Sequence, residues 1–220
     1  MKKNLLASVA FAACCVANSA SAIVIGDPNS HFSDNCYPFG CATGVGEYQQ
    51  AYGIASFSYP VRIGGIRLFG ASYPYWENGK QPSQGNFTIT LSSSQKFGFP
   101  MSDNIGWDSV VVYDGALPGL DAYGDLTIMF DTVFTYVPNR TRDLDLLMDI
   151  KWTGASSSQR PVYFVTDRSS WSESDAWDDL PIRYEGLVTE FIETPEPASL
   201  TLLALGLVGL GTVRRKRSCP

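Results

Sequence analysis

Short runs of hydrophobic residues recur through residues 23–193, and each run is bounded by residues that favour turns. Within the runs, hydrophobic and polar positions alternate or hydrophobic residues follow one another directly, as in half-buried or buried β-strands. Only the stretch 48–57 fits a helical period as well as it fits a strand. The predicted strands are 61–70, 86–92, 108–115, 125–131, 144–152, 161–167 and 185–193. Seven or eight strands without crossover helices predict an all-β antiparallel sandwich, jelly-roll-like in topology.

The strand predicted at 61–70 contains a break in its alternation. Hydrophobic side chains occupy alternate positions before and after Gly64 and Gly65, but the two sets have opposite parity. An extra residue at that point would restore one buried face, so a β-bulge is expected there. The stretches between strands are rich in turn residues and are expected to be loops: 71–86, 114–125, 153–160 and 168–181.

The first 22 residues have the organisation of a secretory signal peptide. Lys2 and Lys3 precede an apolar stretch, and Ala20-Ser21-Ala22 matches the small-residue site at which signal peptidase cleaves. The domain after cleavage therefore spans residues 23–193. Two alternatives stay open: a lipoprotein signal with Cys14 as the lipidated residue, and a retained anchor, for which the apolar stretch is short of the ~30 Å that a spanning helix must cover.

Residues 194–220 combine three features in a fixed order. Pro195, Glu196 and Pro197 come first, an uncharged apolar stretch follows at 198–213, and the basic cluster consists of Arg214, Arg215, Lys216 and Arg217. As a helix, 198–213 would reach about 24 Å at ~1.5 Å per residue, which is a marginal transmembrane span. The basic cluster favours the cytoplasmic side, so the domain is expected in the periplasm of an inner-membrane-anchored precursor.

This ordered set resembles the PEP-CTERM sorting signal of exopolysaccharide-producing Gram-negative bacteria. The resemblance implies processing by the membrane protease exosortase, followed by location at the cell surface or in the extracellular matrix. The domain also resembles a type that recurs among PEP-CTERM proteins. This second resemblance implies a fold but no activity. The residues that carry this second resemblance are Tyr48-Gln49-Gln50-Ala51-Tyr52, Gly85-Asn86-Phe87-Thr88-Ile89, Phe134-Thr135-Tyr136-Val137-Pro138 and Leu146-Leu147-Met148-Asp149-Ile150.

Composition agrees with an exported β-protein and narrows its partners. Aromatic residues make up 13% of the chain, which also has 20 Gly and 13 Pro but only 17% charged residues. Of the 16 basic residues, 6 lie in the two terminal clusters, so the middle of the chain carries 10 basic against 22 acidic side chains. This excess of negative charge argues against nucleic acid as a partner.

Cys36 and Cys41 are expected to form a disulfide. They lie five positions apart in an exported chain, and Pro38 and Gly40 between them favour the tight turn that such a short loop needs. Two free thiols are the alternative. Metal binding by the two cysteines is disfavoured. His31 is the one further ligand nearby, and three ligands leave a tetrahedral site one short.

The sequence lacks the common signatures of catalysis, and we expect the protein not to be an enzyme. His31 is the single histidine, and the chain has no G-x-S-x-G, G-x-x-x-x-G-K-[ST] or H-E-x-x-H motif. A pair of carboxylates remains an alternative, and Asp143, Asp145 and Asp149 are candidates. Asp145 and Asp149 are nevertheless expected to point outward from a strand into solvent.

No cofactor is expected, and whether the protein binds a metal is left open, with structural calcium as the alternative considered. Loop oxygens suited to calcium occur in two clusters. They are Asp103, Asn104 and Asp108 in one, and Glu173, Asp175, Asp178 and Asp179 in the other. Solvated acidic loops are the simpler interpretation of both.

Aromatic residues in the predicted loops are the remaining functional hint: Tyr73, Tyr75, Trp76, Trp171 and Trp177. They either cap the core or form a platform for a sugar ligand, with Trp171 and Trp177 as the candidate residues. We therefore expect a structural or adhesive protein of the cell envelope or biofilm matrix. The alternatives are a carbohydrate-binding module for exopolysaccharide and a carboxylate-dependent glycan hydrolase.

Overall fold

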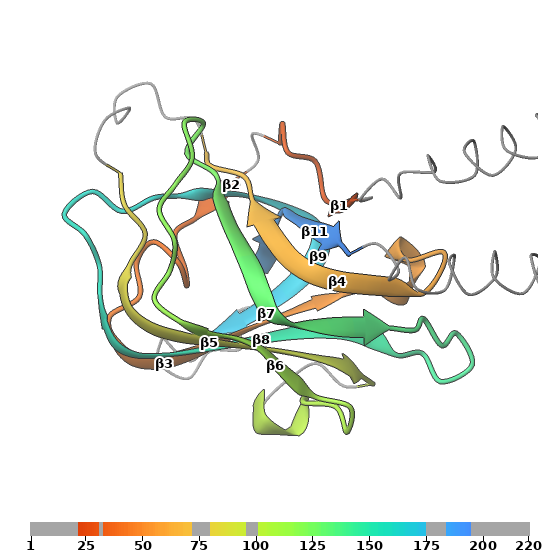
Figure 1. Cartoon of the computed structure of the whole chain (residues 1–220). Coiled ribbons are helices and arrows are strands. Elements are labelled where there is room, and N and C mark those ends of the chain that lie inside the picture. The colour runs from red at the N-terminus through yellow and green to blue at the C-terminus, as the bar shows by residue number, and fades with distance from the viewer. Residues whose placement is uncertain (1–21, 31–32, 72–79, 96–100, 175–183, 195–220) are drawn as a thin grey trace, which may run out of the picture. The chain divides into compact units, whose positions relative to one another are not determined.

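The computed structural model describes residues 22–30, 33–71, 80–95, 101–174 and 184–194 of the chain. These residues fold into two antiparallel β-sheets packed face to face, which agrees with the predicted sandwich (Figure 1). The smaller sheet has four strands in the order β1 (Ala22–Ile25), β11 (Thr189–Glu193), β4 (Val61–Leu68) and β7 (Leu126–Tyr136).

The larger sheet has seven strands. Six follow the order β10 (Tyr184–Leu187), β9 (Phe164–Ser174), β3 (Gly44–Tyr52), β8 (Asp145–Ser156), β5 (Gln84–Ser94) and β6 (Val110–Gly115), and β2 (Ser33–Asn35) pairs with β9. Two short 3₁₀ helices, η1 (Ile54–Ser56) and η2 (Met101–Asp103), lie in connections.

The core lies between the sheets and is rich in aromatic side chains. Tyr52 packs edge-on against Phe191 with ring centroids 4.8 Å apart, which joins the large sheet to the small one. Trp152 is among the largest fully buried side chains, and its indole nitrogen donates to the carbonyl of Thr43. Each such ring removes a large apolar surface from water, and full burial is worth about 1.5–3 kcal/mol.

The predicted bulge in β4 is confirmed. The register of β4 shifts between Ile63 and Gly65 against β7 and at the same point against β11. Ile63 on one side of the shift and Ile66 on the other are both fully buried, so the extra residue keeps one face of β4 on the core.

Several details of the predicted strand pattern were wrong, and β8 for example continues through residues 153–156 of an expected loop. The run 185–193 forms two strands in different sheets, because the chain crosses between them at Val188, whose N–H donates to the Val165 carbonyl. Strand β9 extends through residues 168–174, which were expected to be loop. The short strands β1 and β2 were not predicted. The ambiguous stretch 48–57 completes β3 and then forms η1.

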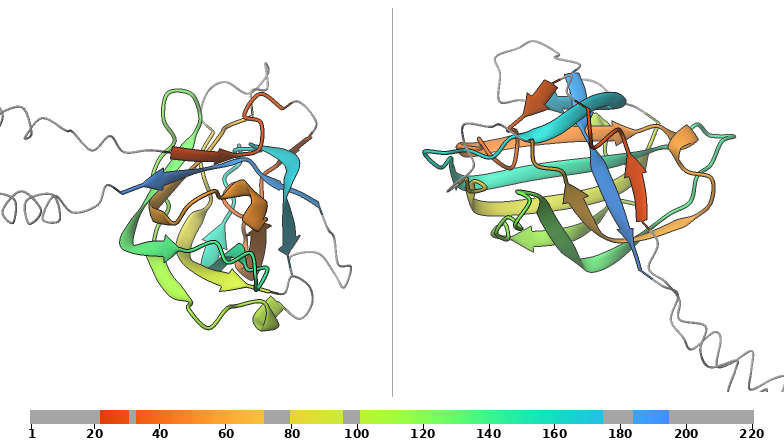
Figure 2. Two further views of the ribbon diagram at one scale, coloured as in Figure 1. Left: turned by 90° about the vertical axis from the view of Figure 1, so that its right-hand side faces the viewer. Right: turned by 90° about the horizontal axis from the view of Figure 1, so that it is seen from above.

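Strands β1 and β11 lie side by side in the small sheet (Figure 2). Ala22 pairs with Ile192, and Ile23 pairs with Phe191. The residues at which the described domain begins and ends are therefore antiparallel neighbours.

Candidate functional site

The targeting segments themselves lie outside the described residues. This holds for Pro195, Glu196 and Pro197, for the apolar stretch 198–213, for Arg214, Arg215, Lys216 and Arg217, and for most of the predicted signal peptide. The structure describes only the residues to which they are joined, Ala22 in β1 and Glu193 at the end of β11. Within the described part of the chain, no helix is long and apolar enough to cross a membrane.

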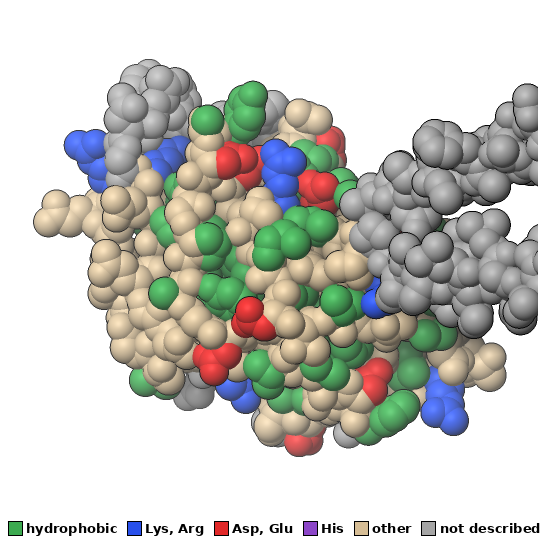
Figure 3. Space-filling model, in the orientation of Figure 1, with side chains coloured by type: hydrophobic (Ala, Val, Ile, Leu, Met, Phe, Trp, Pro, Cys, Tyr) green, Lys and Arg blue, Asp and Glu red, His purple; other side chains and the backbone are tan. Residues whose placement is uncertain are grey.

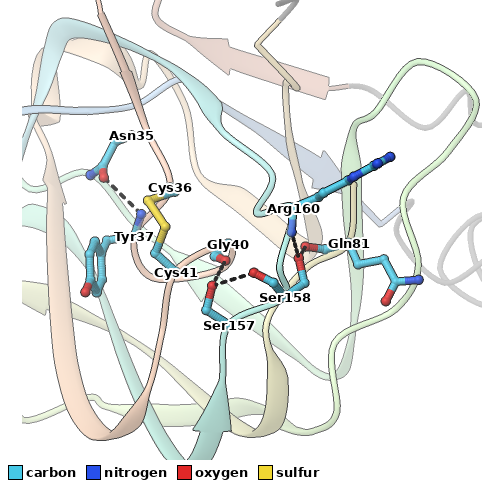
Figure 4. The surroundings of a disulfide bond; sticks show 9 residues. All are labelled: Asn35, Cys36, Tyr37, Gly40, Cys41, Gln81, Ser157, Ser158 and Arg160. Atoms are coloured by element: carbon cyan, nitrogen blue, oxygen red, sulfur yellow. Dashed lines mark hydrogen bonds between the residues drawn. A yellow bond between two sulfur atoms is a disulfide. The ribbon is translucent and has the colours of Figure 1, made fainter. Parts of the chain in front are cut away.

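Cys36 and Cys41 are joined by a disulfide in the structure, with their Cα atoms 5.2 Å apart (Figure 4). The N–H groups of Gly40 and Cys41 both donate to the Cys36 carbonyl, and the peptide bond before Pro38 is cis. These contacts close the short loop on itself, as the expected turn residues would do.

The disulfide loop is also fixed to the body of the sandwich. Phe39 is fully buried and lies edge-on to Phe164, with ring centroids 6.3 Å apart. A Cβ on Gly40 would lie 2.0 Å from the carbonyl oxygen of Val162, so only glycine fits at this close approach. The Ser157 hydroxyl donates to the Gly40 carbonyl (Figure 4). The loop therefore packs against the core, and its two cysteines are bonded to each other and offer no free thiol.

The expectation that Asp149 is a solvated strand residue was wrong. Asp149 is only 2% exposed, and one of its carboxylate oxygens accepts a 2.8 Å hydrogen bond from the Gln49 side chain. The reason lies in the chain segment 101–108, which covers this part of the outer face of the large sheet: Gln49 also donates to the Met101 carbonyl. A strand residue that points away from one core is thus buried under a second layer.

Asp149 belongs to a small charged cluster on neighbouring strands. The Lys151 ammonium lies 3.5 Å from Glu47 and 3.9 Å from Asp149. Burial, followed by the hydrogen bond and the charge of Asp149, raises the pKa of Glu47 to about 7, while Lys151 acts in the opposite direction. The two carboxyl groups share one polar neighbourhood and are linked through the Gln49 amide.

The other two candidate carboxylates are separate from this cluster. Asp145 is half-buried and accepts a 2.8 Å hydrogen bond from the Ile54 N–H. Burial raises the pKa of Asp145, and that hydrogen bond partly offsets the rise. Asp143 is exposed, with φ 51° in the turn before β8. The three aspartates therefore do not converge on one site.

The first predicted calcium cluster is used for internal contacts. The Asn104 side chain donates to the Gln49 side-chain oxygen at 2.8 Å, and an Asp108 oxygen accepts from the Ser93 N–H at 2.8 Å. The interpretation of this cluster as a solvated acidic loop is wrong for Asn104, which is 2% exposed. Among the described residues, no group of three or more His, Cys, Asp and Glu side chains could hold a metal ion.

The second predicted calcium cluster and the aromatic platform fall largely outside the described residues. This applies to Tyr73, Tyr75, Trp76, Asp175, Trp177, Asp178 and Asp179, and the single histidine, His31, lies outside them as well. The backbone of Trp171 lies in β9, opposite Ala51 of β3 and Glu185 of β10, and Glu173 lies opposite Gln49. This stretch was expected to be loop, yet residues 170–174 pair with β3, and Trp171 and Ser172 also pair with β10.

The structure reveals a pocket that the sequence did not indicate. It has a volume of about 400 Å³ and lies between the end of β5 (Ser93–Gln95), the segment 103–107 and the turn that carries Arg142 and Leu144. Trp107 is part of its lining and is 83% exposed. A tryptophan in the turn-rich stretch directly before a strand was the available signal, but that stretch was considered only for its oxygen ligands.

The face shown in Figure 3 carries charges of both signs. Acidic and basic side chains of the described residues are interspersed there with hydrophobic and uncharged polar ones.

Comparison with known proteins identifies the C-terminal segment. The family described as "PEP-CTERM protein-sorting motif" matches residues 193–217. No curated protein and no solved structure matches the chain. The chain therefore carries a PEP-CTERM sorting motif, which implies an exported protein that is first anchored in the membrane and then processed by exosortase.

Proposed function

We propose that the protein is a non-catalytic structural or adhesive module of the cell envelope or biofilm matrix. It is cut from its signal peptide at Ile23, held in the inner membrane with its domain in the periplasm, and delivered to the surface or matrix after sorting. The sorting motif at 193–217 supports export and processing, and the β-sandwich is the part that is delivered.

The observation that carries the sorting part of this proposal is the place of the domain's first and last strands side by side in one sheet. β1 begins at Ala22, the last residue of the predicted signal peptide, and β11 ends at Glu193, where the sorting motif begins. Because Ala22 lies opposite Ile192, both targeting segments join the domain at the same end of one strand pair. A sandwich built in this way can fold while both segments are held at one membrane surface.

The use of the buried and half-buried carboxylates supports a role without catalysis. Asp149 accepts from Gln49, Asp108 accepts from a backbone N–H, and Asp145 accepts from the start of η1. Glu47 and Asp149 form a carboxyl pair in hydrogen-bond contact, which makes them the candidate for a catalytic dyad. Glycoside hydrolysis needs carboxyl groups about 5–10 Å apart with the sugar between them, and this pair is instead bridged by Gln49 and Lys151.

A deletion strain of the producing bacterium tests this proposal. Loss of the protein should weaken cohesion or attachment of the matrix, and the full chain should restore it. The variant Glu47→Gln should restore it equally, because the proposed role needs no ionisable Glu47. A hydrolase that uses the Glu47 and Asp149 pair would instead lose its effect in Glu47→Gln while keeping its melting temperature, and that result would overturn the non-catalytic role.

A carbohydrate-binding role is the second candidate, and one specific observation favours it. Trp107 is 83% exposed at the rim of the pocket beside β5. An exposed indole next to polar groups is a common surface for sugar rings. The pair predicted from the sequence, Trp171 and Trp177, is the alternative location for this role, and no described side chain tests it.

A further inference from the structure

Trp107 is 83% exposed, and hydrogen bonds of the residues on both sides of it fix its backbone. Its neighbour Gly106 donates its N–H to the Ser92 hydroxyl at 3.0 Å. A Cβ on Gly106 would lie 1.9 Å from the Ser93 carbonyl oxygen, so the backbone here lies directly against β5. On the other side, the Asp108 side chain accepts from the Ser93 N–H. The backbone that carries the exposed indole is thus held against β5 on both sides of Trp107.

Asn104, near the start of the segment 101–108, is hydrogen-bonded to the large sheet beneath it. Asn104 donates to the buried Gln49 side chain at 2.8 Å, and its carbonyl accepts from the Ser94 hydroxyl. These contacts attach the segment to β3 and β5 at separate points. A binding surface that is already rigid loses little conformational entropy when a ligand settles on it.

The opposite wall of the pocket is the turn between β7 and β8. The Arg142 N–H donates to the Asn139 carbonyl, and the Gln95 side chain donates to the Arg142 carbonyl at 2.8 Å. The Arg142 side chain is exposed, and no ion pair joins it to the described residues. Asp103 and Gln95 are exposed at the same pocket. The residues that line the space beside the indole therefore include an arginine, an aspartate and a glutamine, all of them exposed.

We propose that the pocket beside Trp107 binds the pyranose rings of a polysaccharide chain. The indole supplies a flat apolar surface for the C–H face of a ring, while Arg142, Asp103 and Gln95 supply donors and acceptors for its hydroxyl groups. This inference rests on the proposed function and gives it a ligand class and a site.

The composition of the pocket favours a sugar over an apolar ligand. Its volume of about 400 Å³ lies in the range of small-molecule sites, about 300–1,000 Å³. Apart from Trp107, its hydrophobic lining consists of Ile105, which is half-buried, and Leu144, which is buried. An apolar ligand would contact one apolar wall, but it would also displace water from the charged groups without replacing the hydrogen bonds of that water. A ring with one apolar face and several hydroxyl groups satisfies both kinds of wall.

The test uses protein purified from cells that express the full chain, probed on an array of neutral and uronic-acid oligosaccharides. The best oligosaccharide is then titrated against wild type and Trp107→Ala. We expect binding at least about tenfold weaker in Trp107→Ala, since central aromatic contacts dominate such interfaces. The matched control is Tyr123→Ala, which removes an aromatic side chain that is 85% exposed outside the pocket, and it should change the affinity less than about twofold.

Two further variants separate the outcomes. Arg142→Gln should weaken the binding of uronic-acid oligosaccharides more than that of neutral ones, because it removes a charge but keeps a donor. The double variant Trp171→Ala/Trp177→Ala should bind as wild type does. If that double variant loses binding and Trp107→Ala keeps it, the site lies elsewhere and the inference is overturned, although a carbohydrate-binding role stands.

Two other results would also overturn the inference. One is wild-type affinity in Trp107→Ala at an unchanged melting temperature. The other is the absence of binding to every oligosaccharide on the array by wild-type protein. In that second case, a deletion strain that still loses matrix cohesion would leave the proposed structural or adhesive function in place.

Discussion

Replacing Gln49 by Ala should destabilise the domain strongly, although Gln49 points away from the main core. Gln49 is fully buried between the large sheet and the segment 101–108. Its amide nitrogen donates to Asp149 at 2.8 Å and to the Met101 carbonyl at 3.1 Å. Its side-chain oxygen accepts from Asn104 at 2.8 Å. One truncation therefore removes every contact by which this side chain joins the two layers.

The magnitude follows from two of the hydrogen bonds that are lost. The Asp149 carboxylate and the Asn104 amide belong to residues that are each 2% exposed, and Asp149 keeps the Lys151 ammonium beside it. A hydrogen bond to a charged group is worth about 1.5–3 kcal/mol and one between neutral groups about 0.5–1.5 kcal/mol, so the two together give about 2–4.5 kcal/mol. Water that enters the vacated space would bring the cost toward the lower end. For a domain of this size the loss corresponds to a decrease in melting temperature of at least about 4 °C.

Urea unfolding of wild type and Gln49→Ala measures this loss directly. The matched control is Gln84→Ala, which makes the same chemical change at an exposed residue at the start of β5 and should stay within about 0.5 kcal/mol of wild type. A double-mutant cycle with Asn104→Ala should show a coupling of about 1 kcal/mol or more. If Gln49→Ala unfolds within about 0.5 kcal/mol of wild type, Gln49 does not anchor the segment that carries Trp107, and the reasoning fails.

Three further predictions concern the disulfide, the charged cluster and the topology. Alkylation without reduction should leave Cys36 and Cys41 unmodified, and mass spectrometry that finds both thiols alkylated would contradict the bridge. The variant Cys36→Ser/Cys41→Ser should have a free energy of unfolding about 2 kcal/mol lower than wild type, as the loop-entropy relation gives for so short a loop. Because the pKa of Glu47 is raised from 4.5 to about 7, the folded state holds a proton that the unfolded state has released, so stability should fall as pH rises from about 4.5 through 7. Asp145, whose pKa is also raised, adds a change of the same sign, so Glu47→Gln should reduce the pH dependence without abolishing it; an unchanged pH profile in Glu47→Gln would count against the assignment. A reporter fused after Pro220 should be active only on the cytoplasmic side of the precursor, and activity confined to the periplasm would reverse the proposed orientation.

Periodicity alone predicted the sandwich because most strands have one face on the core. The bulge at Gly64 and Gly65 was predictable for the same reason, since a change of parity in a strand with one buried face leaves no other solution. Strands β1 and β2 have only a few residues each, and their runs are too short to show a period. The crossing at Val188 was hidden because consecutive buried residues look like one continuous strand.

The candidate site was less predictable because it depends on contacts between distant segments. Asp149 alternates as an outward residue should, and only the segment 101–108 folding over it makes it buried. The adjacent pair Gln49-Gln50 was the one sequence signal, since glutamines on both faces of a central strand must find partners. Gln50 does so on the inner face, where it donates to the Leu187 carbonyl. The exposure of Trp107 likewise follows from tertiary packing, and its place in a turn-rich stretch directly before a strand was only a weak signal of it.

Mass spectrometry of the intact protein recovered from the extracellular matrix tests the central claim most directly. The account predicts a chain that begins at Ile23, contains the whole domain to Glu193 and lacks the apolar stretch 198–213 and the basic residues after it. Recovery in the membrane fraction alone, with the C-terminus intact through Pro220, would contradict the claim that this β-sandwich is a sorted and released module.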